Sequence, residues 1–335
     1  MSRTSLDRLS VRWEPAPGLE EKRRSGFDQT KAEEVNRESD LRFTLRTGNA
    51  SKPMMYGLKV VLKYLLGVDK ANRNFRVYAD DTFLVSYPRS GNTWTRFLIA
   101  NLVYPHANVS FLNIEKLIPD TASQSSRALK RTPRPRLIKT HQYFDHRYPK
   151  TIYIVRDPRD VALSYYDFQR KYMQIEDGHP LERYIEDFVR GRLGSEDWGS
   201  WGENVASWIY TRGWRKEFLL LRYEDMLKDT VVELGRIARF LAIDPEPSVL
   251  ERAVRLSSAD RMRELEKAEQ QQWIGTKNRR QDIPFVRVAK AGGWRASMPE
   301  ACARKIESAW GSIMASLGYP LMGGKQSDRV LSISC

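Results

Sequence analysis

The most constraining feature of the sequence is a repeated order of short apolar runs, polar loops and helical segments. Thr82 to Tyr87 is a short run rich in β-forming residues, a polar loop of small residues covers 88–92, and Trp94 to Val103 is apolar. This order predicts a strand, a loop and a helix. Further strands are predicted at 136–141, 151–155 and 218–222.

Strands that alternate with helices indicate a parallel sheet with helices on both faces. In such sheets, ligands bind at the carboxyl ends of the strands. The unusual polar clusters of this sequence all follow predicted strand ends. No repeat with a period of 20 to 50 residues is present, so we expect one principal domain.

Composition and charge narrow the class of protein. The 335 residues include 56 Lys and Arg against 42 Asp and Glu, a net charge of +14, which favours anionic partners without choosing among cofactors, nucleic acids and lipids. Two cysteines, Cys302 and Cys335, exclude a disulfide framework. The first 52 residues lack the apolar core of a signal peptide. We therefore predict a cytoplasmic protein.

The chain is predicted to divide into three parts. Residues 1–52 form a polar extension rich in Arg, Glu, Ser and Asp, 53–322 form the single domain, and 323–335 form a tail. The apolar run from Gly57 to Val68 is interrupted by two lysines and falls short of the roughly 20 residues of a spanning helix. We expect no integral membrane segment.

The loop Tyr-Pro-Arg-Ser-Gly-Asn-Thr-Trp at 87–94 carries the strongest functional signal. A strand that turns through small residues into a helix directs backbone amides and the helix dipole at one point, which suits an anion. The loop lacks the Gly-x-x-x-x-Gly-Lys-Ser/Thr pattern of nucleotide triphosphatases and the Gly-x-Ser-x-Gly pattern of a nucleophile elbow. Both of these enzyme classes are disfavoured.

This loop closely resembles the first signature of the cytosolic-type sulfotransferases. The resemblance continues in order through 137–141, 155–164, 221–226 and 287–294 and covers about residues 81–294. It implies an α/β, P-loop-like fold, with a parallel central sheet flanked by helices on both faces. It also implies an enzyme that transfers the sulfuryl group of 3'-phosphoadenosine 5'-phosphosulfate (PAPS) to a hydroxyl or amine of a small-molecule acceptor, leaving adenosine 3',5'-bisphosphate (PAP).

The resemblance implies three catalytic residues. His141 is the expected general base, since a neutral imidazole accepts a proton near neutral pH. Lys139 lies two residues earlier on the same strand, so it points to the same side of the sheet and would offset charge on the sulfuryl group. Arg89 stands where the family commonly has lysine; its guanidinium would act electrostatically, because its pKa is too high for proton transfer.

The resemblance also implies a set of residues that bind PAPS. They are Arg89, Ser90, Gly91, Asn92, Thr93 and Trp94 in the first loop, Arg156 and Ser164 at the 3'-phosphate, Tyr223 and Ser257 at the nucleotide, and Arg287, Val288 and Ala289 in the last segment. Two departures from the family pattern stand out. Val288 and Ala289 replace the usual lysine and glycine, and Ala259 lies where an adenine-stacking phenylalanine is usual.

Several alternatives remain open at the level of sequence. The acceptor could be a carbohydrate or a lipid-linked molecule, and a nucleotide-dependent phosphotransferase or an acidic-surface binder would also use the positive charge. We expect no metal, because the other histidines lack metal-ligand spacing, and no nucleic-acid partner; a homodimer is left open. Residues 270–286 resemble a lid, and aromatic residues of an acceptor pocket are predicted at Tyr143, Phe144, Tyr165, Tyr166 and Phe168.

Overall fold

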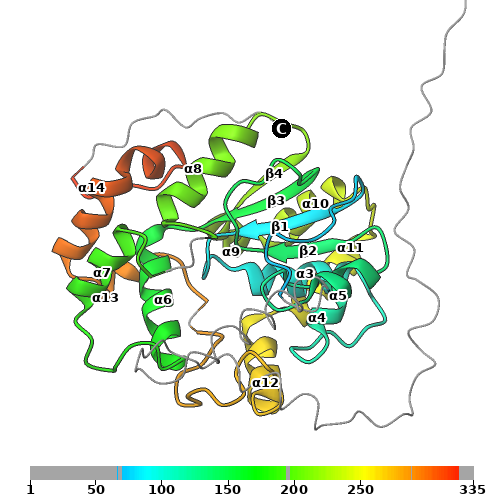
Figure 1. Cartoon of the computed structure of the whole chain (residues 1–335), viewed down its shortest axis with the longest axis horizontal. Helices are drawn as coiled ribbons and strands as arrows, with labels where there is room; N and C mark the ends of the chain where they lie inside the picture. The colour runs from blue at the N-terminus through cyan, green and yellow to red at the C-terminus, as the bar shows by residue number, and fades with distance from the viewer. Residues whose placement is uncertain (1–65, 67–69, 194–196, 288, 324–335) are drawn as a thin grey trace, which may run out of the picture.

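The structure is a computed structural model that describes residues 66, 70–193, 197–287 and 289–323 (Figure 1). The predicted extension 1–52 lies outside the described residues, as do 53–65, Val288 and all of the predicted tail except Gly323.

Four parallel strands form the central sheet. They are β1 (Thr82–Ser86), β2 (Leu137–Thr140), β3 (Lys150–Val155) and β4 (Phe218–Arg222). Their spatial order is β2-β1-β3-β4, and every neighbouring pair is parallel. The polar segments that follow all four strands therefore lie together at the carboxyl end of the sheet. This is the parallel arrangement that the alternating pattern predicts.

Alternate residues of the strands enter two separate hydrophobic cores, one on each face. On β1, Phe83 and Val85 pack into one core, and Leu84 packs into the other. The first core lies under α6 (Pro158–Lys171), α7 (Leu181–Val189), α8 (Trp201–Arg212) and α14 (Glu300–Ser316); the second lies under α3 (Asn92–Val103), α10 (Thr230–Phe240) and α11 (Pro247–Leu256). Figure 1 shows helices on both sides of the sheet.

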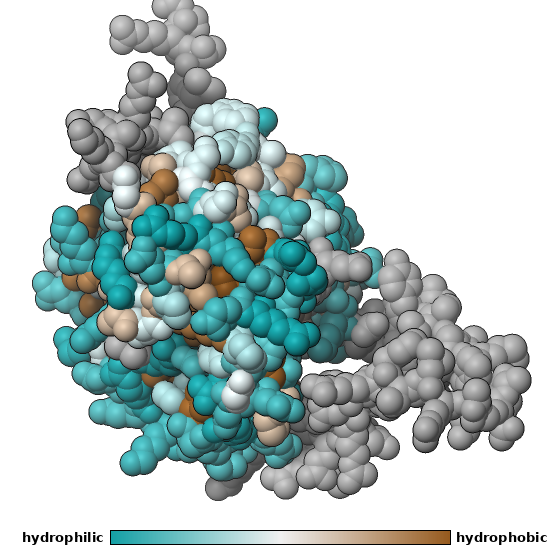
Figure 2. Space-filling model, turned by 90° about the vertical axis from the view of Figure 1, so that its left-hand side faces the viewer, coloured by the Kyte–Doolittle hydropathy of each residue, from teal (hydrophilic) through white to brown (hydrophobic). Residues whose placement is uncertain are grey.

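Further helices complete the described fold. They are α4 (Ile114–Leu117), α5 (Ser126–Arg131), α9 (Tyr223–Lys228), α12 (Ala259–Glu269) and α13 (Trp294–Ser297). The surface around α7 and α14 is largely hydrophilic, with small separate hydrophobic patches (Figure 2). Within the described ranges, no helix is both long enough and apolar enough to cross a bilayer.

The starts of two helices beside the sheet are set by the loops that precede them. Helix α6 begins at Pro158 because the side chain of Asp157 accepts a hydrogen bond from the amide of Arg159 and caps the helix. Helix α3 begins at Asn92, directly after Gly91, so its first turn belongs to the polar loop itself. The loop and the helix therefore form one structural unit at the end of β1.

Candidate active site

A cavity of about 1440 Å³ lies at the carboxyl ends of the four strands. His141, Arg156 and Tyr223 directly follow β2, β3 and β4, and Arg89 follows β1 by three residues. The cavity is lined by twelve of the residues predicted for the site: Arg89, Gly91, Asn92, Thr93, Trp94, Lys139, His141, Arg156, Ser164, Tyr223, Arg287 and Ala289. Two others, Ser90 and Ser257, are fully buried beside it. Val288 lies outside the described residues.

The loop after β1 places the amino end of α3 at the cavity. Gly91 has a φ of 99°, a left-handed conformation that a side chain would strain. The ring of Tyr223 packs directly against it, because a Cβ at this position would lie 2.5 Å from Tyr223 Cδ2. The hydroxyl of Ser90 is buried and has no hydrogen-bond partner among the described residues. Helix amides and an unpartnered hydroxyl together suit an anionic ligand.

Arg89 is fixed by contacts with two distant segments. Its Nε donates to Ser164 Oγ at 3.2 Å and its Nη2 donates to the carbonyl of Phe285 at 3.2 Å. The guanidinium lies 4.9 Å from the ring centroid of Phe168 and 4.8 Å from that of Phe285. Burial lowers the pKa of Arg89 to about 10. The side chain is therefore still a cation at neutral pH.

Arg156 and Arg287 differ in how their charges are balanced. Arg156 donates to the carbonyls of Arg89 and Lys290 at 3.2 and 3.3 Å and lies 4.3 Å from the ring centroid of Tyr223. It forms no ion pair with an acid in the part of the chain that the structure describes, and its Nε has no partner there. Arg287 instead pairs with Asp167 at 2.8 Å. Arg156 is thus the stronger candidate for a phosphate.

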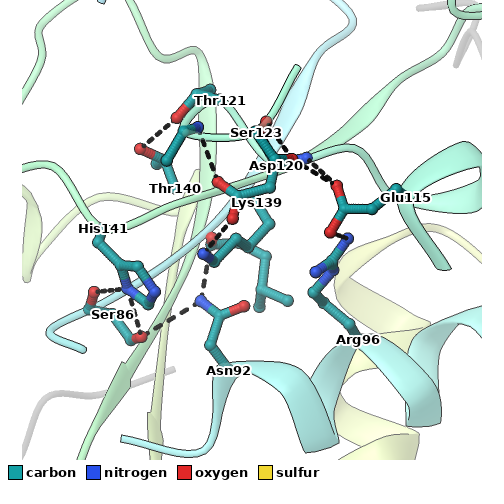
Figure 3. Close-up of polar contacts among 12 residues, drawn as sticks. Ser86, Asn92, Arg96, Glu115, Asp120, Thr121, Ser123, Lys139, Thr140 and His141 are labelled. Carbon is teal, nitrogen blue, oxygen red and sulfur yellow. Dashed lines mark hydrogen bonds and ion pairs between the residues drawn. The ribbon is translucent and has the colours of Figure 1, made fainter. Parts of the chain in front are cut away.

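His141 presents a neutral ring nitrogen to the cavity. Its Nδ1 lies 2.8 Å from the carbonyl oxygen of Ser86 (Figure 3). A carbonyl only accepts, so Nδ1 carries the hydrogen and Nε2 is the acceptor. Burial, reinforced by the charge of Lys139, lowers the pKa of His141 to about 3. The imidazole is therefore neutral across the physiological range.

Lys139 reaches the cavity wall beside His141, but its amine is already paired. The Nζ atom donates to the carboxylate of Asp120, a residue that lies in none of the sequence motifs (Figure 3). Both residues are 8% exposed. No local sequence signal distinguishes Asp120, because its partner is brought to it only by the alignment of residues 119–121 along β2.

The residues predicted to contact the adenine and the rest of the nucleotide fall into two groups. The rings of Trp94 and Tyr223 pack edge to face, with centroids 5.7 Å apart, and both line the cavity. Ser257 does not line it; its hydroxyl accepts from Asn101 Nδ2 at 3.0 Å, and its carbonyl accepts from Trp94 Nε1 at 3.0 Å. Ser257 therefore reaches the site only through Trp94. Ala259 does line the cavity.

Several aromatic side chains line the cavity. Tyr165, Tyr166 and Phe168 line it as the sequence suggests, whereas the predicted Tyr143 and Phe144 are not among the lining residues. Trp198 was not anticipated, and its ring centroid lies 6.3 Å from that of His141. It comes from the segment before α8, where no motif marks it.

The segment 270–286, predicted as a lid, is held by hydrogen bonds to two buried charged side chains. The buried amine of Lys171 donates to the carbonyls of Arg280 and Ile283 at 2.9 and 2.7 Å. The buried carboxylate of Glu266 accepts from the amides of Phe285 and Val286 at 2.5 and 2.8 Å. The segment has no helix or strand. These side-chain contacts hold it against Arg89, which contacts Phe285.

Comparison with known proteins decides the family. The family model described as the sulfotransferase domain matches residues 79–318. The chain belongs to the sulfotransferase family. This confirms the resemblance seen in the sequence, and the sulfotransferase is an enzyme that uses PAPS and acts on small-molecule acceptors.

Relatives and solved structures agree with this assignment. Sulfotransferase 1C2 of Oryctolagus cuniculus is 27% identical over 252 residues, which cover 70% of this chain and 83% of the relative. The 3-beta-hydroxysteroid sulfotransferase of Cavia porcellus is 28% identical over 258 residues, covering 73% and 87%. The structure of mouse sulfotransferase SULT7A1 complexed with PAP is 26% identical with a TM-score of 0.58, covering 74% and 89%.

A further solved structure shares the fold of this sulfotransferase. Retinol dehydratase in complex with androsterone and inactive cofactor PAP is 22% identical with a TM-score of 0.62, covering 76% of this chain and 85% of that one. The sulfotransferase α/β fold implied by the sequence is confirmed. Across the described residues, no three His, Cys, Asp or Glu side chains are grouped to hold a metal ion.

Proposed function

We propose that His141 is the general base of this sulfotransferase and that Arg89 and Lys139 stabilise negative charge on the sulfuryl group during transfer. The observation that carries the proposal is the hydrogen bond from His141 Nδ1 to the carbonyl of Ser86. It leaves Nε2 as a neutral acceptor in the cavity that also holds Arg156 and the amino end of α3. PAPS, when bound, supplies an activated sulfuryl group on its 5'-phosphate.

The residues present fit a donor with two separate anionic ends. Arg89, Ser90, Gly91, Asn92 and Thr93 would hold the 5'-phosphosulfate, since the helix amides and the unpartnered Ser90 hydroxyl lie there. At the other end, Arg156 and Ser164 would hold the 3'-phosphate, because a planar guanidinium suits a phosphate. Trp94 and Tyr223 would contact the adenine. Arg287 and Ala289 would complete the site, as would Val288 from outside the described residues.

The chain's own groups can move the proton and exclude water. An acceptor hydroxyl beside His141 would transfer its proton to Nε2, and the resulting imidazolium would keep its Nδ1 hydrogen bond to Ser86. Arg89 would act by charge alone, since it is held as a cation between two aromatic rings. The segment over Arg89 would limit the entry of water.

The lining favours an acceptor with an apolar or aromatic body. Tyr165, Tyr166, Phe168 and Trp198 all line the cavity that holds His141, and such surfaces bind apolar groups with a few oriented polar contacts. The relative from Cavia porcellus is named as a 3-beta-hydroxysteroid sulfotransferase, which supports this class. A carbohydrate or lipid-linked acceptor is the alternative.

We further propose, from the sequence, that residues 53–322 form a single domain and that the protein is cytoplasmic. The reaction as derived needs no metal, because the cations and helix amides of the cavity supply the charge stabilisation. A homodimer stays a prediction.

The direct test of this function is transfer of labelled sulfur from PAPS to a mixture of phenols, sterols and sugars. We expect wild-type protein to label at least one acceptor and His141→Ala to lose transfer by about 100-fold or more, while binding PAP with unchanged affinity. Full turnover by His141→Ala contradicts the role of His141. Phosphorylated product formed from ATP and magnesium would instead support a phosphotransferase.

A further inference from the structure

Asp120 is a buried acid beside the general base that none of the functional motifs includes. It is 8% exposed, lines the cavity, and accepts a charged hydrogen bond from Lys139 (Figure 3). In the described structure, the amine of Lys139 has this one side-chain anion as its partner. The placement of the Lys139 amine therefore depends on Asp120.

The backbone around Asp120 is fixed along the edge of β2. The amide of Lys139 donates to the carbonyl of Pro119 at 2.8 Å, and the amide of Thr121 donates to the carbonyl of Lys139 at 3.0 Å. The remaining carboxylate oxygen of Asp120 accepts from the amide of Ala122 at 2.9 Å. These bonds hold the carboxylate in one orientation against the strand that ends just before His141.

A second acid connects this segment to helix α3. Glu115 accepts from the amide of Asp120 at 3.2 Å and from Arg96 Nη2 at 3.0 Å. Two anions, Glu115 and Asp120, thus lie between two cations, and each is paired with one of them: Glu115 with Arg96 and Asp120 with Lys139 (Figure 3). Each buried charge is therefore balanced by an opposite charge in its own pair.

The charge of Asp120 also acts on His141. Although burial opposes its ionisation, the positive charges of Lys139 and Arg96 hold the pKa of Asp120 below its usual value, so it is an anion at neutral pH. The carboxylate partly offsets the effect of Lys139 on the imidazole. Without Asp120, a mobile and unbalanced ammonium would lie beside the base and make His141 less basic.

We propose that Asp120 is the positioning residue for Lys139: it anchors one of the three amine hydrogens, so that the others stay available in the cavity, and it balances the lysine charge beside His141. The proposal rests on the function proposed above. It predicts that Asp120 acts on the reaction through Lys139 and not through the stability of its own loop.

A double-mutant cycle tests this. We measure kcat, KM and PAP affinity for wild type, Asp120→Asn, Lys139→Met and the double variant, with labelled PAPS and one acceptor. We expect Asp120→Asn to lower kcat by about 10- to 100-fold, the range for a charged buried hydrogen bond, with little change in PAP affinity. In the Lys139→Met background, the same substitution should lower kcat by less than about 3-fold. Asp120→Glu should restore part of the rate.

Thr121→Val is the matched control, because it removes the 3.1 Å hydroxyl contact with Thr140 from the same segment without touching the Lys139 amine. It should keep near wild-type kcat. If Asp120→Asn does not fold, which lost PAP binding would reveal, Asp120→Ser replaces it in the cycle.

Each outcome separates the inference from the proposed function. Equal losses from removing Asp120 in both backgrounds, or unchanged kcat in Asp120→Asn, overturn the positioning role while the function stands. A wild-type protein that transfers no sulfur, or an active His141→Ala variant, overturns the proposed function instead.

Discussion

Substitution of Gly91 by alanine tests the geometry of the donor site most sharply. Gly91 combines a φ of 99° with the ring of Tyr223 in contact with its Cα. An alanine Cβ would lie 2.5 Å from Cδ2 and 2.9 Å from Cε2 of that ring. Either the loop or Tyr223 must therefore move.

The loss of stability in Gly91→Ala comes from the strained backbone and from the displacement of Tyr223. A side chain at this φ is disfavoured by about 1–2 kcal/mol. Displacing Tyr223 weakens its contact with Arg156, worth about 0.5–2 kcal/mol, and its packing on Trp94, worth about 0.5–1.5 kcal/mol. We expect the free energy of unfolding to fall by about 2–5 kcal/mol and PAP to bind about 10- to 100-fold more weakly, since 1.4 kcal/mol is tenfold.

The assay is titration calorimetry with PAP together with urea unfolding. Gly178→Ala is the matched control, because a Cβ there meets nothing within 4 Å; its affinity should equal that of wild type. In a Tyr223→Ala background, Gly91→Ala should cost only the backbone strain. Wild-type PAP affinity in the Gly91→Ala variant refutes the reasoning.

Three further predictions follow from the charges. The pKa of His141 is lowered to about 3, so the unfolded imidazole, with a pKa of about 6.5, takes up a proton that the folded one does not; the free energy of unfolding should fall as the pH drops from about 6.5 to about 3. Urea unfolding at several pH values should show that the free energy of unfolding of His141→Gln falls less steeply with decreasing pH in that window. An unchanged dependence on pH contradicts the assignment. Arg156→Leu should weaken PAP binding about 10- to 100-fold and Arg287→Leu less, because Arg287 is shared with Asp167; calorimetry that ranks them in reverse order is the contrary result. Glu266→Gln should loosen residues 279–287 and speed their proteolysis, with Glu264→Gln as the exposed control; equal digestion rates would show that Glu266 does not hold the segment.

The sequence predicts the sheet well because its signals are local. The run 218–222 coincides with β4, since a short apolar run bounded by polar residues carries its limits in its own composition. The same local pattern places His141 at the end of a predicted strand and Arg156 and Tyr223 directly after two others, and the parallel sheet then brings them to one cavity. That part of the site needs no knowledge of side-chain packing.

The partners of these residues are not local and could not be predicted. Arg89 meets the carbonyl of Phe285, 196 positions away, and Lys139 meets Asp120 across the edge of β2. Arg287 was expected to face a phosphate, but its ion pair with Asp167 depends on how the segment after α12 folds back over α6. Such contacts arise from the packing of helices and loops, which residue type and spacing do not specify.

The most direct test of the central claim is a crystal structure of the protein with PAP. We predict the 5'-phosphate at the amides that begin α3, the 3'-phosphate on Arg156 and Ser164, and His141 Nε2 facing the 5' end. PAP bound at another surface, or with Arg156 and His141 contacting neither end of it, would contradict the account.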